Sequence, residues 1–201
     1  MPKIDQFEQV QLDEDHAVFM GRLRNKLIPT DSEFETLWTL HPTERPTIKI
    51  HGKDVRIPRW QQAYGRDYRF SGTISSALPI PDQLKPYIEW AQETIDSRLN
   101  GMLLNWYDGA LGHYIGKHRD SNKGIIANTP YVTISLGESR VFRFQKWRGM
   151  ERLDLIGEHG SVIVIPYHVN KAWTHAVPKT TRAKARRVSI TVRAFENEKV
   201  V

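Results

Sequence analysis

The chain has 201 residues, which is enough for one domain with a substantial core, and we expect a single domain over residues 1–201. Hydrophobic residues make up 39% of the chain and charged residues 26%, values that exclude a disordered or fibrous protein. The absence of cysteine excludes disulfides, thiolate metal sites and cysteine nucleophiles, and the net charge of +6 favours an anionic partner.

No apolar run approaches the roughly 20 residues that a membrane-spanning helix needs. The N-terminal segment MPKIDQFEQVQLDEDH also lacks the apolar core of a signal peptide. We therefore expect a soluble intracellular protein, located in the cytoplasm or in the nucleus or nucleoid, that contacts no membrane and is a monomer.

In chain order, the first hundred residues favour helices with one hairpin between them. Apolar spacing and turn residues predict helices over residues 13–27, 32–40 and 82–99. Asp31 or Ser32 would cap the second of these helices at its N-terminus. Residues 47–57 alternate apolar and polar side chains around Gly52, which predicts a β-hairpin.

From residue 102 onward, short apolar or alternating runs are separated by turn residues. The clearest predicted strands cover residues 102–107, 131–136, 140–144, 161–165 and 188–193. Strands of this length and spacing are typical of an antiparallel sandwich or barrel. We therefore expect an α+β, mainly β protein, in which a jelly roll over residues 102–195 is supported by helices and a hairpin from residues 1–101.

A metal site is predicted from His118, Asp120 and His175. His118 and Asp120 are two residues apart, so both side chains would leave the same face of an extended segment. Such a triplet often arises by chance, and a surface histidine beside a solvated acid is the alternative. His175 lies just beyond the apolar run 162–166 and would supply a third ligand from an adjacent strand. Two imidazoles and one carboxylate on one octahedral face suit Fe(II) and leave three positions open.

A polar strand face follows twelve residues after His175. Its members alternate with apolar side chains along one predicted strand: Arg187, Ser189, Thr191 and Arg193. This face suits a dicarboxylate that chelates the metal and pairs with Arg187, whereas the alternative is an exposed edge strand with ordinary surface arginines. Asn105 and Tyr107 share a face of an earlier strand and would donate hydrogen bonds to the same acid.

The order and separation of these residues resemble the AlkB family of 2-oxoglutarate-dependent dioxygenases. The resemblance covers about residues 45–195 and rests on Asn105-x-Tyr107, His118-x-Asp120, His175 and Arg187-x-x-x-Thr191-x-Arg193. It is nearest to the DNA and RNA dealkylases, which carry a hairpin before a Pro-Arg and an aromatic-Ser-Gly segment. The matching segments here are Pro58-Arg59, Tyr64-Gly65 and Tyr68-Arg69-Phe70-Ser71-Gly72.

The resemblance implies that Fe(II), 2-oxoglutarate and O2 act together at this site. The iron ligands would be His118, Asp120 and His175. The residues that bind 2-oxoglutarate would be Asn105, Tyr107, Ser189, Thr191, Arg187 on the distal carboxylate and Arg193 near the chelating end.

The same resemblance implies a substrate of alkylated DNA or RNA. Phe70 and the ring of His118 would sandwich a flipped base. The hairpin tip, Ile50-His51-Gly52, would probe or wedge the duplex. The remaining predicted substrate contacts are Tyr68, Ser121 and three phosphate-binding side chains, Lys53, Arg56 and Arg59.

The chain departs from the repair branch directly after Asp120. That branch usually continues with further acids, one of which helps to read the damaged base, whereas Ser121 and Asn122 stand here. We expect iron binding to survive this change. The departure bears instead on how a cationic methylated base is recognised, and so on repair as the biological role.

The implied reaction is oxidative dealkylation of damaged bases, as in DNA repair, with release of succinate, CO2 and formaldehyde. One alternative is the same oxygenase chemistry on a protein side chain, a small molecule or an unmodified base. Another is a jelly roll that binds nucleic acid without turnover. Succinate release separates the last from the first two, and formaldehyde release from methylated oligonucleotides separates the first from the second.

Overall fold

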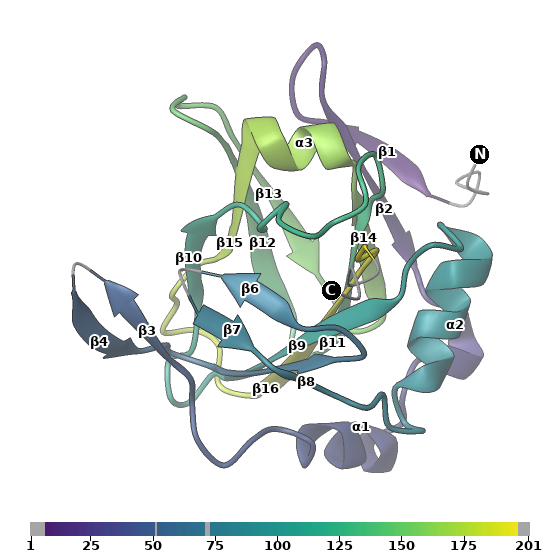
Figure 1. Ribbon diagram of the computed structural model, residues 1–201, viewed down its shortest axis with the longest axis vertical. Coiled ribbons are helices and arrows are strands. Elements are labelled where there is room, and N and C mark those ends of the chain that lie inside the picture. Colours follow the sequence, from purple (N-terminus) through teal and green to yellow (C-terminus); the bar gives the residue numbers. More distant parts are fainter. Residues whose placement is uncertain (1–6, 51, 71–72, 197–201) are drawn as a thin grey trace, which may run out of the picture.

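The computed structural model describes residues 7–50, 52–70 and 73–196, which form two facing β-sheets (Figure 1). The larger sheet contains, in spatial order, β1 (Glu8–Gln11), β2 (Ala17–Arg22), β14 (Ser161–Ile165), β11 (Tyr131–Gly137), β16 (Arg186–Arg193), β9 (Gly101–Asp108), β5 (Trp60–Tyr64) and β8 (Ala77–Leu78). The smaller sheet contains β10 (Ile115–His118), β15 (Trp173–Val177), β12 (Arg140–Lys146) and β13 (Arg152–Gly157). Only β5 and β8 pair in parallel among the described strands.

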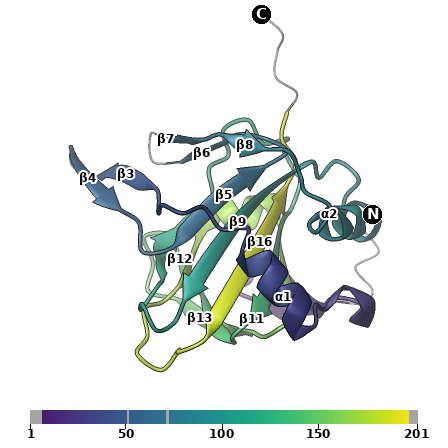
Figure 2. The same cartoon turned by 90° about the horizontal axis from the view of Figure 1, so that it is seen from below.

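Two hairpins and three α-helices complete the described chain. The hairpins are β3 (Thr47–Ile50) with β4 (Lys53–Arg56), and β6 (Tyr68–Phe70) with β7 (Thr73–Ser75). The helices are α1 (Asp31–Trp38), α2 (Lys85–Thr94) and α3 (Tyr167–Ala172), with a 3-10 turn, η2, at Asn25–Leu27. Helices α1 and α2 pack on the outer face of the larger sheet, while β3–β4 projects from the body of the molecule (Figure 2). No helix of the described chain is long and apolar enough to cross a membrane.

Side chains alternate along β9 and β16, so each strand has one face toward the helices and one face between the two sheets. Apolar side chains on one face, such as Trp106 and Ile190, pack under the helices and are fully buried. The other face points between the sheets, because side chains on a strand alternate with a period of two. On β16 that inner face carries Arg187, Ser189, Thr191 and Arg193, all of them buried. A polar face inside a sandwich requires polar partners or a bound ligand.

The predicted helix over residues 13–27 is wrong. The chain instead forms the hairpin β1–β2, which extends the larger sheet through pairing of β2 with β14. The turn is fixed by Asp13, whose Oδ1 lies 2.7 Å from Nδ1 of His16. Backbone pairing with a buried strand outweighs the helical spacing of the apolar residues, since local propensity is a weak prior.

The other predicted elements are confirmed with shifted ends. Helix α1 is capped by Thr30, not Asp31 or Ser32, and Thr30 forms a capping box with Glu33. Helix α2 starts at Lys85, with Pro86 in its first turn, and ends at Thr94, so it is shorter than the predicted 82–99. The five predicted strands correspond to β9, β11, β12, β14 and β16, and the β3–β4 hairpin turns at Gly52 with a φ of 78°.

Candidate active site

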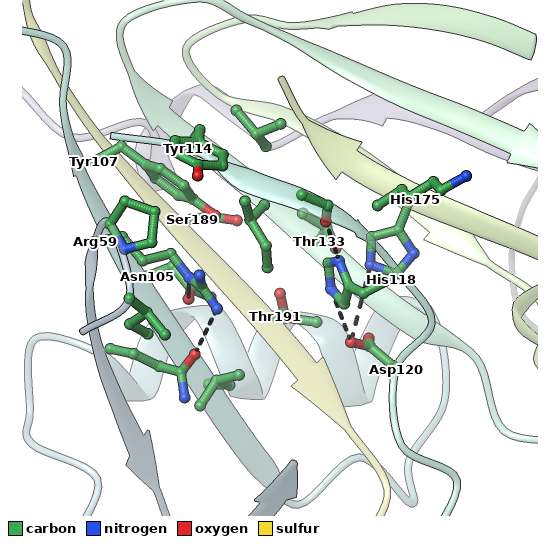
Figure 3. A pocket seen from close by; sticks show the side chains of 18 of the residues that line it. Arg59, Asn105, Tyr107, Tyr114, His118, Asp120, Thr133, His175, Ser189 and Thr191 are labelled. Carbon is green, nitrogen blue, oxygen red and sulfur yellow. Dashed lines mark hydrogen bonds and ion pairs between the residues drawn. The ribbon is translucent and has the colours of Figure 1, made fainter. Parts of the chain in front are cut away.

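His118, Asp120 and His175 converge between the two sheets (Figure 3). One donor atom from each side chain lies within 4.8 Å of the others. The carboxylate Oδ1 of Asp120 is 3.7 Å from Nε2 of His118 and 3.9 Å from Nε2 of His175. No second group of three such residues occurs in the part of the chain that the structure describes.

The smaller sheet positions both imidazoles. His118 ends β10 directly opposite His175 on β15, so the pairing of two strands brings the rings together. Nδ1 of His118 donates to the carbonyl of Gly116 at 3.0 Å, which leaves the Nε2 lone pair for a metal. The ring of Phe142 stacks on His175 with centroids 5.3 Å apart and fixes its plane.

The protonation states suit metal binding. Burial alone would raise the pKa of Asp120, but Arg193 and the two imidazoles outweigh it and hold this pKa well below its usual range. Burial lowers the pKa of His175 to about 3, and it also lowers that of His118. At neutral pH the site therefore offers a carboxylate anion and two neutral imidazoles, the forms in which these residues bind metals.

Arg193 on β16 and Tyr68 on the β6–β7 hairpin fix the carboxylate of Asp120. Nη2 and Nε of Arg193 donate to Oδ2 of Asp120 at 2.9 and 3.3 Å, and the Tyr68 hydroxyl donates to Oδ1 at 3.4 Å. The Arg193 guanidinium also lies 4.4 Å from the centroid of the Tyr68 ring. Oδ1 is thus left facing the two imidazoles while Oδ2 is held in place.

Asn170 on α3 braces the backbone that carries Asp120. Its side-chain oxygen accepts from the Asp120 N–H at 2.9 Å, and its nitrogen donates to the Asp120 carbonyl at 3.0 Å. The same nitrogen donates to Oδ1 of Asn122 at 3.0 Å. With only 2% of its surface exposed, this amide sets where the loop after β10 begins.

Replacing Asn170 with alanine should weaken Mn(II) binding by about 10- to 100-fold, the usual effect of removing a residue that orients a metal ligand. Electron paramagnetic resonance of free Mn(II) measures the dissociation constant directly. The control is Lys171→Ala, the next residue of α3, whose side chain is exposed. Equal Mn(II) affinities for the two variants would contradict the bracing role.

A cavity of about 490 Å³ opens beside the three residues, within the usual size for a small-molecule site. The predicted co-substrate residues that line it are Asn105, Tyr107, Ser189, Thr191 and Arg193. Thr133 of β11 joins them on the same inner face. Figure 3 shows the side chains of β9 (Asn105 and Tyr107), β11 (Thr133) and β16 (Ser189 and Thr191) directed into one space, next to the His118, Asp120 and His175 cluster.

Arg187 is a buried cation without an acid partner in the described chain. It is 1% exposed, and its Nη2 donates to the hydroxyl of Ser135 at 2.9 Å. Nε and Nη1 have no hydrogen-bond partner, and the guanidinium lies 5.1 Å from the ring centroid of Tyr107, which lines the cavity. Burial and nearby Arg140 both lower the pKa of Arg187. Arg193 also has a buried nitrogen, Nη1, without a partner, and two buried guanidiniums with unused donors fit a small dicarboxylate such as 2-oxoglutarate.

Arg59 does not lie where a phosphate contact requires. Its side chain is 7% exposed and forms part of the cavity wall. Nε donates to Oδ1 of Asn105 at 2.7 Å, and Nη2 donates to Oε1 of Gln61 at 3.0 Å. The predicted phosphate contact of Arg59 is therefore wrong, because its guanidinium points inward toward β9, the strand that pairs with β5.

The other predicted substrate residues occupy two places. Lys53 and Arg56 are exposed on β4, and Arg56 lies 3.7 Å from Glu44 in an exposed ion pair. Tyr68 and Ser121 line the cavity. Three predicted contacts fall outside what the structure describes: His51 and the side chains of Ile50 and Phe70.

Sequence reasoning missed several residues of this site. They come from separate strands and one short helix: Gln61, Thr133, Ser135, Arg140 and Asn170. Thr133 and Ser135 are polar side chains in the apolar run of β11, whereas no such contrast marks Gln61, Arg140 or Asn170. That local contrast is a signal for a buried polar group, although it does not specify the partner.

Comparisons with known proteins agree with this geometry. The model of the 2OG-Fe(II) oxygenase superfamily matches residues 31–193. DNA oxidative demethylase ALKBH2 from Mus musculus is 30% identical over 190 residues, covering 89% of this chain and 78% of that protein. Its counterpart from Homo sapiens is 29% identical over 195 residues, covering 90% and 73%.

The solved structure described as "The structure of OsALKBH1" superposes with a TM-score of 0.59 at 13% identity and covers 94% of this chain and 100% of its own. At that identity the likeness concerns the fold alone, and it confirms the expected double-stranded β-helix, or jelly roll. Family model, relatives and fold agree with each other. The chain belongs to the AlkB family within the 2OG-Fe(II) oxygenase superfamily.

Proposed function

We propose that this chain is a 2-oxoglutarate-dependent dioxygenase that oxidatively removes alkyl groups from damaged DNA bases. The relatives named DNA oxidative demethylase support the substrate, and the family supports the chemistry. The observation that carries the proposal is the cluster of His118, Asp120 and His175 in a cavity whose wall includes Tyr107, the ring next to the partnerless nitrogens of buried Arg187. The protein would act as a single-domain monomer on DNA in the nucleus or nucleoid.

When bound, Fe(II) with 2-oxoglutarate and O2 would supply the oxidation: 2-oxoglutarate becomes succinate and CO2, and a hydroxylated N-methyl carbon leaves as formaldehyde. His118, Asp120 and His175 would hold the metal. Arg193 would keep the Asp120 carboxylate charged and oriented, as its two hydrogen bonds to Oδ2 indicate. No side chain of this site needs to act as a general acid or base.

The co-substrate would be held by side chains with hydrogen-bond donors that have no partner within the described part of the protein. Arg187 would pair with the distal carboxylate through Nε and Nη1. Arg59 occupies Oδ1 of Asn105, which leaves the Asn105 amide nitrogen as a donor toward the cavity. Tyr107, Ser189 and Thr191 would add hydroxyl groups along the same wall.

The nucleic acid would approach from the side of the two hairpins. Exposed Lys53 and Arg56 on β4 would contact phosphates, which position a duplex without reading its sequence. The tip of the β3–β4 hairpin would probe or wedge the duplex, Phe70 would stack on the flipped base, and Tyr68 and Ser121 would line the pocket of that base.

A second candidate keeps the oxygenase chemistry and changes the substrate to a protein, a small molecule or an unmodified base. It is favoured by one observation: among the described residues that line the cavity, Asp120 is the only acid. Damaged bases that carry a positive charge would therefore find no free carboxylate there.

Turnover assays separate the candidates. The protein is supplied with Fe(II), 2-oxoglutarate and O2, and succinate and formaldehyde are measured with methylated oligonucleotides, unmethylated oligonucleotides or a panel of small molecules. The proposal expects formaldehyde from methylated DNA only, in equal amount to the succinate formed by coupled turnover. Formaldehyde from none of the methylated oligonucleotides, with succinate stimulated by another substrate, would refute it.

A further inference from the structure

The cavity presents an excess of positive charge to whatever it binds, and this bears on the substrate of the proposed function. Four of the charged side chains that line it are cations: Arg59, Lys117, Arg119 and Arg193. The single acid, Asp120, is committed to Arg193 and to the two imidazoles. The charges of Fe(II) and of the 2-oxoglutarate dianion cancel, so the charged side chains determine the sign of the net charge in the cavity.

Arg59 is the buried cation in the cavity wall that has no acid partner among the described residues. It is 7% exposed in the cavity wall, and its hydrogen-bond partners are the neutral amides of Asn105 and Gln61. No ion pair to Arg59 occurs among the described residues. A second cation placed nearby would meet repulsion that water screens poorly in a buried site.

The same wall also presents hydrogen-bond donors to the cavity. Oε1 of Gln61 accepts from Arg59, so the amide presents its nitrogen, and this Nε2 is buried without any partner. Gln61 is 3% exposed and lines the cavity. The hydroxyl of Ser121 adds a rotatable donor where an acid would have been an acceptor only. A ligand that satisfies the buried Gln61 nitrogen must bring an acceptor.

Alkylated bases fall into two chemical classes with respect to these features. Methylation at N1 of adenine or N3 of cytosine fixes a positive charge on a ring whose exocyclic amino group is a donor. Methylation at N3 of thymine leaves a neutral ring that offers two carbonyl oxygens as acceptors.

We infer that the cavity selects neutral alkylated bases that present carbonyl oxygens, such as N3-methylthymine, over cationic bases that present an amino group. The inference rests on the proposed function, and two linked features carry it: the buried cation Arg59, and the partnerless nitrogen of Gln61, whose amide Arg59 orients. Ser121 is then a residue that determines specificity, because it adds no second negative charge beside Asp120.

The test uses one oligonucleotide sequence with N3-methylthymine, N1-methyladenine or N3-methylcytosine at the same position. Formaldehyde release gives kcat/KM for each. For the wild-type protein we expect N3-methylthymine to be favoured by at least about tenfold, the ratio that corresponds to about 1.4 kcal/mol. A preference for either cationic base, or equal kcat/KM values, overturns the inference and leaves the proposed function standing.

A charge change at one position sharpens the experiment. Ser121→Asp should shift the ratio of kcat/KM for N1-methyladenine to kcat/KM for N3-methylthymine about tenfold toward the cationic base. Ser121→Asn, whose side chain matches aspartate in size but is neutral, should leave that ratio unchanged. An equal shift in both variants would assign the effect to side-chain size and overturn the role of charge. Absence of formaldehyde from all three oligonucleotides with the wild-type protein refutes the proposed function and the inference with it.

Discussion

Replacing Asp120 with asparagine is expected to lower coupled turnover by more than about 100-fold, since loss of a metal ligand should exceed the effect of losing a residue that only orients one. The variant keeps the shape of the side chain but removes its charge. Arg193 would then be buried with no carboxylate to accept from its Nη2, which now lies 2.9 Å from Oδ2. Breaking a buried pair in this way costs about 3–5 kcal/mol of unfolding free energy.

Asp154→Asn provides the matched control for Asp120→Asn. Asp154 pairs with Arg143 at 2.6 Å on the smaller sheet, but both side chains are about one-third exposed. Its loss should cost no more than about 1 kcal/mol and should leave turnover unchanged. Urea unfolding and succinate release measure the two effects. Similar losses for both variants would contradict the assignment of Asp120 to the metal.

Arg187→Met is expected to have opposite effects on stability and on co-substrate binding. The free protein should be as stable as the wild type or more stable, because an apolar side chain of similar length replaces a buried cation that lacks an acid partner. Affinity for 2-oxoglutarate should fall by at least about 30-fold, the lower end of the cost of about 2–5 kcal/mol for removing one partner of a buried charge pair.

The neighbouring Arg186→Met variant is the control for Arg187→Met. Arg186 lies on the same strand but is exposed, and it pairs with Glu35 at 2.9 Å. The Arg186→Met variant should bind 2-oxoglutarate with nearly the wild-type affinity. Calorimetric titration of 2-oxoglutarate into the Mn(II)-loaded protein, with thermal unfolding of the free protein, separates the two effects. Unchanged 2-oxoglutarate affinity in Arg187→Met would rule out the proposed carboxylate contact.

The parts of the site that could be predicted are those that depend on strand periodicity. His118 and Asp120 are two residues apart, and β16 alternates polar and apolar residues from Arg187 to Arg193. A period of two fixes which side chains share a face without any knowledge of the fold. The structure places these residues together, while their roles in binding iron and 2-oxoglutarate stay predictions.

The parts that could not be predicted depend on contacts distant in sequence. Arg59 is paired with Asn105, 46 positions away, and Asn170 with Asp120, 50 positions away. No local pattern identifies such partners, so Arg59 was interpreted as a surface phosphate contact and Asn170 was missed. The helix prediction was wrong over residues 17–22 for the same reason, because the strand conformation of this segment follows from its pairing with β14.

The central claim is tested most directly by an anaerobic crystal structure of the protein with Mn(II) and 2-oxoglutarate. The account predicts one Mn(II) bound by Nε2 of His118, Nε2 of His175 and the carboxylate of Asp120. It also predicts that the distal carboxylate of 2-oxoglutarate accepts hydrogen bonds from Arg187. A metal bound elsewhere, or a 2-oxoglutarate molecule whose distal carboxylate makes no contact with Arg187, would contradict it.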